Sequence, residues 1–541
     1  GNALLGATPA LMENGIPDEA WTAIEGDDKR TASSLKRQNK HEASGQLTMT
    51  SMWARKTETE AAALKAAIAE LEASPDTDHR ALTKKEARWA ELQASEAWKL
   101  QHLVADAWCA AFAWPMPEGG GLVAGVAPTN AVWRDLRDGK GTPPALLVET
   151  VEEIAAQHRF FHWHLACPGV FEKGGFDVVL GNPPWERVKL QEQEFFASKS
   201  PGIAEAANAA ARKRMISTLP ETAPGLWAEW CAASREAEAQ SHFVRNAGRY
   251  PLCGKGDVNT YALFAEHNRA LLGPRGRGGF IVPTGIATDD TTKEYFGALV
   301  AGRELARFLS FENEEFIFPE VHHAFKFALI TVDGAGRSDA ADLLFFARSV
   351  GALSDPARHF TLSSADFLAL NPNTRTCPTF RSRRDADLNL TLYRRAGVLW
   401  REGPPEENPW GLRFMAMLHM ANDSGLFRTR ERLEGEGWTL AGNRFVRGGE
   451  VMLPLVEAKM VHHLDHRFGT YEDRARGRRT RESCPSWTTW NMRPQRASRC
   501  RRVGSPLQKW RRASPTAGPA VGSSAGGTSA AAPTNAPSSP P

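Results

Sequence analysis

The sequence has few cysteines and no long apolar segment. Its 541 residues include seven cysteines, none of them in a C-x-x-C pair, which argues against a disulfide framework and against zinc-finger spacing. The longest apolar stretches are short and interrupted, as in Leu103–Trp114, so we expect no bilayer-spanning segment. No charged and apolar leader follows Gly1, so no secretory signal is expected. We therefore expect a cytoplasmic protein without membrane contact.

Acidic residues are absent beyond Glu482, and residues 513–541 carry no charge. Between Asp473 and Arg512, thirteen Lys and Arg face two acids, so the net charge of +3 combines about −8 for residues 1–472 with +11 for the tail. The final stretch is almost entirely Ala, Pro, Ser and Thr, a composition that builds no core. We expect residues 473–541 to be disordered. A basic arm that binds nucleic acid is the alternative.

The first half of the chain has helical patterning. Residues 53–113 are rich in Ala, Glu, Lys and Leu, with apolar positions such as Leu64, Ile68 and Leu71 at helical spacing. A break near Ser74–Asp76 predicts a helical hairpin.

Apolar runs that predict buried strands begin with Phe176–Leu180. We then expect a helix over Tyr261–Leu272, a turn over Gly273–Gly279, and strands over Phe280–Pro283 and Phe325–Val332. This alternation predicts an α/β fold with a mainly parallel sheet. Mixed strands and loops from about residue 340 predict a separate α+β domain that ends near Glu472.

The first strand ends in Asn182-Pro183-Pro184-Trp185. Two prolines fix φ and remove two N–H donors, while the Asn side chain supplies an amide oxygen. The Asn182 oxygen and the Pro183 carbonyl could accept both hydrogens of an exocyclic –NH₂ and make its nitrogen nucleophilic. Trp185 offers a flat face for a base, and such stacking contributes about 1–3 kcal/mol. An ordinary turn is the alternative, but the preceding F-D-V-V-L-G favours a functional site.

The run F-D-V-V-L-G-N-P-P-W resembles the catalytic motif of N6-adenine DNA methyltransferases. More narrowly, the chain resembles the large methyltransferases of BREX and DISARM phage-defence systems and of type IIG restriction–modification enzymes. Further collinear segments carry the resemblance: Asn2–Leu11, Ile16–Asp27, His162–Phe171, Gly254–Phe264, Ile281–Asp290, Asn371–Asp385 and Leu453–Phe468.

The resemblance implies a partial Rossmann-like methyltransferase sheet with a helical insertion, an α+β target-recognition domain and a disordered tail. The implied divisions are an N-terminal methyltransferase remnant with the helical hairpin (1–150), a catalytic core (151–340), a DNA-binding target-recognition domain (341–472) and the tail (473–541). The implied cofactor is S-adenosylmethionine. The implied partners are double-stranded DNA with a flipped adenine, since N6 cannot be reached inside a duplex, and other defence-system subunits.

The resemblance also implies roles for single residues. Asn182 and Pro183 would bind the adenine N6, within the catalytic stretch Asn182, Pro183, Pro184 and Trp185. Trp185 would stack on the flipped base, and Phe318 would cover its other face unless it belongs to the core. Asn2 and Asn182 would contact the cofactor.

Basic and histidine-rich segments are less specific. Arg381, Arg383 and Arg384 either contact DNA phosphate or solvate a linker. The pairs His322-His323 and His462-His463 lack a recognisable set of partner ligands, so we expect no metal site.

Two expected features of such enzymes are missing. No glycine-rich loop after a strand, and no following acidic residue for the cofactor ribose, is apparent before Asn182. We expect the isolated chain to bind S-adenosylmethionine poorly or not at all and to be inactive. Past Glu472 the resemblance stops. Reading Cys500–Trp510 one nucleotide earlier allows a family-like segment, which suggests a frameshift between Glu472 and Cys484.

The leading interpretation is the C-terminal part of a DNA adenine methyltransferase. Methylation of RNA adenine or of protein glutamine is an alternative, because both substrates present a planar –NH₂ group. A non-catalytic DNA-binding fragment, or one chain of a split enzyme, is the third.

Overall fold

A computed structural model describes residues 1–44, 52–414, 418–419, 422–455, 463 and 504–506. It divides into two compact units, Gly1–Glu407 and Asn408–Pro541. Within the described residues, no helix has the length and apolar character needed to cross a membrane.

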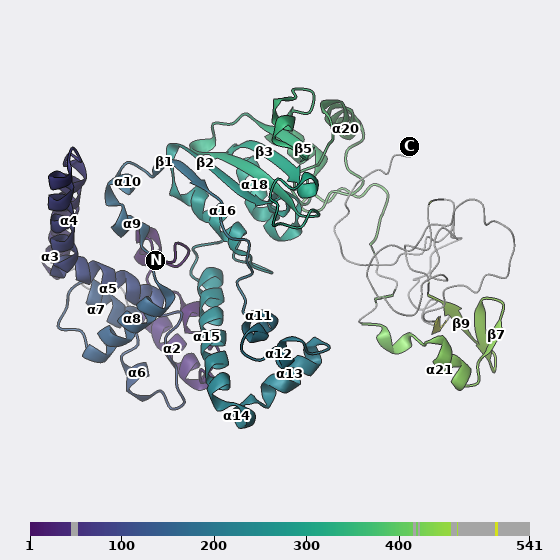
Figure 1. Cartoon of the computed structure of the whole chain (residues 1–541), viewed down its shortest axis with the longest axis horizontal. Coiled ribbons are helices and arrows are strands. Elements are labelled where there is room, and N and C mark those ends of the chain that lie inside the picture. The colour runs from purple at the N-terminus through teal and green to yellow at the C-terminus, as the bar shows by residue number, and fades with distance from the viewer. Residues whose placement is uncertain (45–51, 415–417, 420–421, 456–462, 464–503, 507–541) are drawn as a thin grey trace. The chain divides into compact units, whose positions relative to one another are not determined.

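The first unit begins with helices, and no described strand precedes residue 176. These helices are α1 (Pro9–Glu13), α2 (Lys29–Ser44), α3 (Met52–Ala73), α4 (His79–Ala94), α5 (Glu96–Ala110), α6 (Gly121–Gly125), α7 (Asn130–Arg137), α8 (Ala145–His158), α9 (Trp163–Ala166) and α10 (Pro168–Glu172). The expected helices over 53–113 are present, and α3 and α4 form the predicted hairpin (Figure 1). Asp78 caps α4 by accepting a hydrogen bond from the Ala81 N–H, which explains why a helix restarts there.

A six-stranded sheet follows the N-terminal helices and lies to one side of them and of α15 (Pro224–Asn246) (Figure 1). Its strands are β1 (Phe176–Gly181), β2 (Leu272–Pro283), β3 (Leu305–Glu312), β4 (Lys326–Asp333), β5 (Ala340–Ala347) and β6 (Phe360–Ser363). Their order is β1-β2-β4-β3-β5-β6. The pairs β1–β2 and β3–β5 are parallel, while β2–β4, β3–β4 and β5–β6 are antiparallel. The prediction of a mainly parallel sheet is therefore wrong. Residues 313–325, between β3 and β4, contain no α-helix that would carry the chain back for a parallel pairing.

The glycine-rich segment after α16 (Thr260–Leu271) is also different from the prediction. Gly273–Gly279 was expected to be a turn but lies inside β2. The register explains the difference: Phe176 pairs with Leu272, whereas Val178 pairs with Arg277, so the intervening residues bulge out of the ladder. Only glycine fits at Gly276, because a Cβ there would lie 2.2 Å from the Phe176 carbonyl oxygen.

Side chains alternate between the two faces of the sheet. One face joins the main core with α16 and α18 (Lys293–Ala301), through residues such as Phe280, Phe308 and Ile330. The other face carries a small separate cluster, formed by Leu309, Phe311, Phe327, Leu344 and Ala347. Loop side chains cover this small cluster, and the predicted base-stacking residues lie among them.

The outer edge of the sheet, formed by β1, is bare among the described residues. β1 pairs with β2 on one side only. Val178 and Leu180 point to the same face and are 62% and 78% exposed. Exposed apolar side chains on an unpaired edge form a template for another strand.

Between β1 and α16 the chain forms a helical insertion. Its helices are α11 (Glu192–Ala197), α12 (Pro201–Ala204), α13 (Ala209–Ser217), α14 (Leu219–Thr222) and α15 (Pro224–Asn246). A separate cluster holds its first four helices together through Phe196, Ile203, Ile216 and Leu219.

The division between units differs from the expected boundary at 340/341, because β5 and β6 belong to the same sheet as β1. Three further helices belong to the first unit. α17 (Gly285–Thr288) lies between β2 and β3, whereas α19 (Ser364–Leu370) and α20 (Arg383–Ala396) follow β6. The second unit contains α21 (Arg430–Gly435) and an antiparallel sheet of β7 (Thr439–Ala441), β8 (Arg444–Arg447), β9 (Glu450–Pro454) and β10 (Gly504–Pro506).

Within the tail 473–541, which we expected to be disordered, the structure describes Gly504–Pro506, and these residues form β10 and pair with β9. The free edge of β9 supplies the main-chain groups for this pairing. The rest of the expected tail lies outside the described residues.

Candidate functional site

The carboxyl-terminal ends of four strands, β1, β2, β3 and β5, lie at the same end of the sheet. β1 and β2 run parallel, β3 and β5 run parallel, and the antiparallel β4 begins at this end. Asn182 follows β1 directly, at the position where ligands bind in open α/β sheets.

The side chain of Asn182 is exposed and takes part in no hydrogen bond with a described residue. Pro183 is buried and Pro184 is exposed, so the rigid turn is anchored at its centre. The arrangement leaves the Asn182 amide available for a ligand beyond the strand end.

Thr260 holds this turn in place, a role that the sequence did not predict. Its hydroxyl donates a 2.7 Å hydrogen bond to the Pro184 carbonyl and accepts one of 2.9 Å from the Glu186 N–H. Its own N–H donates to the Glu186 carbonyl at 2.8 Å. One residue at the start of α16 therefore fixes the main chain on both sides of Trp185.

Trp185 is half-buried and packs against both the main core and the small cluster. Its indole Nε1 is buried and has no hydrogen-bond partner among the described residues. A buried N–H without a partner is uncommon in proteins, and a ligand atom at this point could satisfy it.

Phe318 packs on the same small cluster as Trp185, with its ring centroid 5.0 Å from that of Phe327. Its loop is fixed by the fully buried Asn313. The Asn313 amide donates to the carbonyls of Phe318 and Val321 and accepts from the Phe318 N–H, at 2.7–3.0 Å. The structure thus brings the two predicted stacking residues onto one cluster and identifies Asn313 as a positioning residue.

The hydrogen bonds of Asn2 join it to its own segment and to the end of α8, where its N–H donates to the Arg159 carbonyl. Its Oδ1 accepts from the Leu4 N–H at 3.1 Å, and Asn2 forms a single bridge with Phe160. No described hydrogen bond joins Asn2 to Asn182–Trp185. Its predicted contact with a cofactor stays a prediction.

The predicted DNA-contacting arginines are all exposed. Arg381 stacks over the Phe346 ring, 5.3 Å from its centroid, whereas Arg383 and Arg384 occupy the first turn of α20. No group of three or more His, Cys, Asp or Glu side chains among the described residues is arranged to hold a metal. His462 lies outside those residues.

Residues 128–214 match the family model described as Eco57I restriction-modification methylase. The matched stretch contains β1 and Asn182–Trp185. No curated protein gives a significant match. The match supports a restriction-modification methyltransferase.

The described residues do not fit the whole methylase cofactor. A free side-chain amide is present beyond β1, but no described strand precedes β1, and hence no strand-borne glycine-rich loop can hold the methionine part. The part of the chain that the structure describes therefore holds no complete site for such a cofactor.

Proposed function

We propose that this chain carries the substrate-binding half of a site-specific DNA adenine N6-methyltransferase of a phage-defence or restriction–modification system. The observation that carries the proposal is the position of Asn182. Its unpaired amide extends beyond β1, in a turn that Thr260 holds rigid and beside the half-buried Trp185.

The residues of this chain bind and orient the amine. The Asn182 Oδ1 and the Pro183 carbonyl accept the two N6 hydrogens of adenine, which draws the nitrogen lone pair out of conjugation with the ring. No side chain is needed as a general base, because the amine loses its proton after it is alkylated. Trp185 and Phe318 would hold the flipped base between aromatic faces.

The substrate class is tested by offering methyl acceptors side by side. Full-length enzyme with labelled S-adenosylmethionine is incubated with duplex DNA, RNA and protein. Label in N6-methyladenine of DNA supports the proposal. Label in RNA adenine or in protein glutamine would replace it with the alternative that uses the same Asn-Pro-Pro-Trp chemistry.

A second candidate is a split enzyme, and the bare edge of β1 favours it. The outer side of β1 has unpaired main-chain groups, to which another strand, bearing the missing cofactor loop, could pair, and the exposed Val178 and Leu180 could pack against that added segment. This predicts that the purified chain alone shows little or no heat of binding with S-adenosylmethionine. Tight binding by this polypeptide alone would contradict the prediction. The DNA upstream of the codon for Gly1 would reveal whether the loop is encoded in frame or in a separate reading frame.

A further inference from the structure

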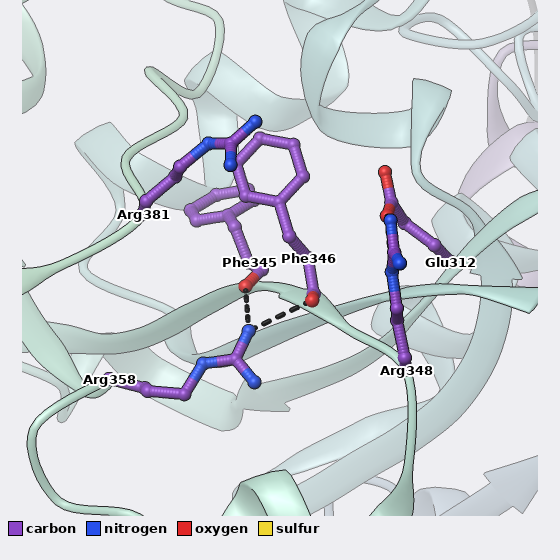
Figure 2. Close-up of a pocket in the computed structure, with 6 residues that line it drawn as sticks. All are labelled: Glu312, Phe345, Phe346, Arg348, Arg358 and Arg381. Atoms are coloured by element: carbon purple, nitrogen blue, oxygen red, sulfur yellow. Dashed lines mark hydrogen bonds and ion pairs between the residues drawn. The ribbon is translucent and has the colours of Figure 1, made fainter. Parts of the chain in front are cut away.

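A cavity of about 350 Å³ lies at the same end of the sheet as Asn182, beyond the carboxyl ends of the strands. Its lining is Glu312, Phe345, Phe346, Arg348, Arg358 and Arg381 (Figure 2). Glu312 ends β3, and Arg348 follows the end of β5. The cavity therefore lies beyond the carboxyl ends of two strands, as Asn182 does for β1.

Positive charge dominates this cavity. Three arginines line it and Lys326 stands beside it, against the single carboxylate of Glu312. Arg348 and Lys326 each contact Glu312 at 3.1 Å. Burial disfavours this carboxylate, but hydrogen bonds from Lys326 and Arg348 outweigh burial and lower its pKa. The carboxylate stays ionised and neutralises only part of the cationic charge.

Two arginines are held in place without a described carboxylate partner. Arg358 donates to the carbonyls of Phe345 and Phe346 at 2.9 and 2.8 Å (Figure 2). Arg381 is positioned by stacking on the Phe346 ring, with its guanidinium free to bond elsewhere (Figure 2). A planar guanidinium that is held in place but not neutralised by a carboxylate is suited to a phosphate group.

Backbone strain supports the interpretation of a built site. Phe346 has φ of 57°, a conformation that costs a bulky residue free energy and is found most often at functional sites. The strain places the Phe346 ring between Lys326, 5.6 Å from its centroid, and Arg381. The left-handed backbone conformation of Phe346 thus places its ring within reach of two cations.

The distance to Asn182 suits a nucleic acid. β1 is separated from β3 and β5 by three and four strand spacings, which amounts to about 14–19 Å at roughly 4.8 Å per spacing. Along B-DNA this distance corresponds to about four to six nucleotides at 3.4 Å each. A phosphate in the cavity would therefore belong to the same DNA segment as a base bound at Asn182.

We propose that this cavity binds a backbone phosphodiester of the duplex a few nucleotides from the target base, with Arg348, Arg358 and Arg381 as its ligands. The proposal rests on the proposed function, because it takes DNA as the substrate. It adds Arg348 and Arg358 to the predicted DNA contacts. Of the three arginines predicted from the sequence, it assigns this phosphate to Arg381 and not to Arg383 or Arg384.

The test measures binding of a fluorescent duplex of about two helical turns to the full chain at several salt concentrations. Arg381→Gln and Arg348→Gln should each weaken binding about 3–10-fold and reduce the slope of log K against log salt by about one. Glu312→Gln should tighten binding. Arg307→Gln is the matched control: Arg307 is an exposed arginine at the opposite end of β3, paired with Asp342, and its loss should change neither quantity.

Two results would overturn the proposal in different ways. If wild-type protein binds the duplex but both arginine variants keep its affinity and slope, the cavity is no phosphate site while the proposed function stands. If folded wild-type protein binds no duplex, both fall. Millimolar deoxyadenosine monophosphate or inorganic phosphate, at matched ionic strength, should leave the duplex bound.

Discussion

At the scale of single residues, the candidate site separates groups that bind from groups that position. Asn182 is exposed and unpaired, so its side chain contributes little to stability, whereas Thr260 and Asn313 are committed to hydrogen bonds that shape the main chain. Variants at the two kinds of position should therefore behave differently.

Replacing Asn182 by Ala should lower methyl transfer by about 10²–10³-fold, the usual effect of removing one oriented polar group from a site. The melting temperature should not change, because no described contact is lost. Radiolabel transfer by the full-length enzyme measures the first quantity and calorimetry the second. The matched control is Asn14→Ala at the end of α1, where the side chain donates to the Ala10 carbonyl; this variant should keep methyl transfer unchanged. A large loss of stability in Asn182→Ala would refute this interpretation.

Replacing Thr260 by Val keeps the shape but removes the hydroxyl between Pro184 and Glu186. We expect a loss of about 0.5–1.5 kcal/mol in the free energy of unfolding, the usual net contribution of a hydrogen bond, because water can reach the polar groups that lose their partner. The rate constant kcat should fall more than KM rises, since the turn is misplaced while DNA contacts elsewhere persist. Thr260→Ser restores the hydroxyl and should restore both; equal behaviour of the two variants would show that the hydroxyl is unimportant.

At the scale of elements, local sequence predicted several strands correctly but not the way they pair. Phe176–Leu180 was recognisable as a strand because it is a short apolar run before a proline turn, and β4 and α16 were found for similar reasons. Strand direction was misjudged because it depends on what fills the connections. The Thr260 contact was hidden because it joins residues 76 positions apart, and no local pattern reports the left-handed Phe346.

The loop between β3 and β4 depends on one buried side chain. Asn313→Ala would leave two carbonyls and one N–H without partners, and should cost about 2–4 kcal/mol. Urea unfolding measures the loss, and limited proteolysis should show faster cleavage within 314–325, where Phe318 lies. Glu314→Ala, an exposed neighbour, should stay within about 0.5 kcal/mol of wild type. Unchanged cleavage of the Asn313 variant would mean that the loop is held by other contacts.

At the scale of the whole molecule, buried neutral histidines tie stability to pH. Burial lowers the pKa of His158 to about 4, and of His164 and His267 to about 3. At His267 the Arg249 guanidinium donates to Nδ1, which requires that nitrogen to be unprotonated.

These pKa values lie below the unfolded value of about 6.5, so the unfolded chain binds protons first on acidification. The contribution of these histidines to the free energy of unfolding should be constant above about pH 6.5. It should fall between about pH 6.5 and 4, by up to about 1.4 kcal/mol per pH unit for each histidine. Denaturant unfolding between pH 7 and 5 tests this pH dependence, because most carboxylates stay ionised over that range. His267→Gln should flatten the slope; a slope of zero in the wild-type protein would contradict the assignment.

The central claim is that Asn182–Trp185 presents adenine N6 for methylation. The most direct measurement is long-read sequencing of genomic DNA from cells that carry the gene in its native context, with and without Asn182→Ala. We predict N6-methyladenine at one defined sequence in the wild type and its disappearance in the variant. Methylation that persists in Asn182→Ala, or a methyl mark that depends on Asn182 but lies on a base other than adenine, would contradict the account.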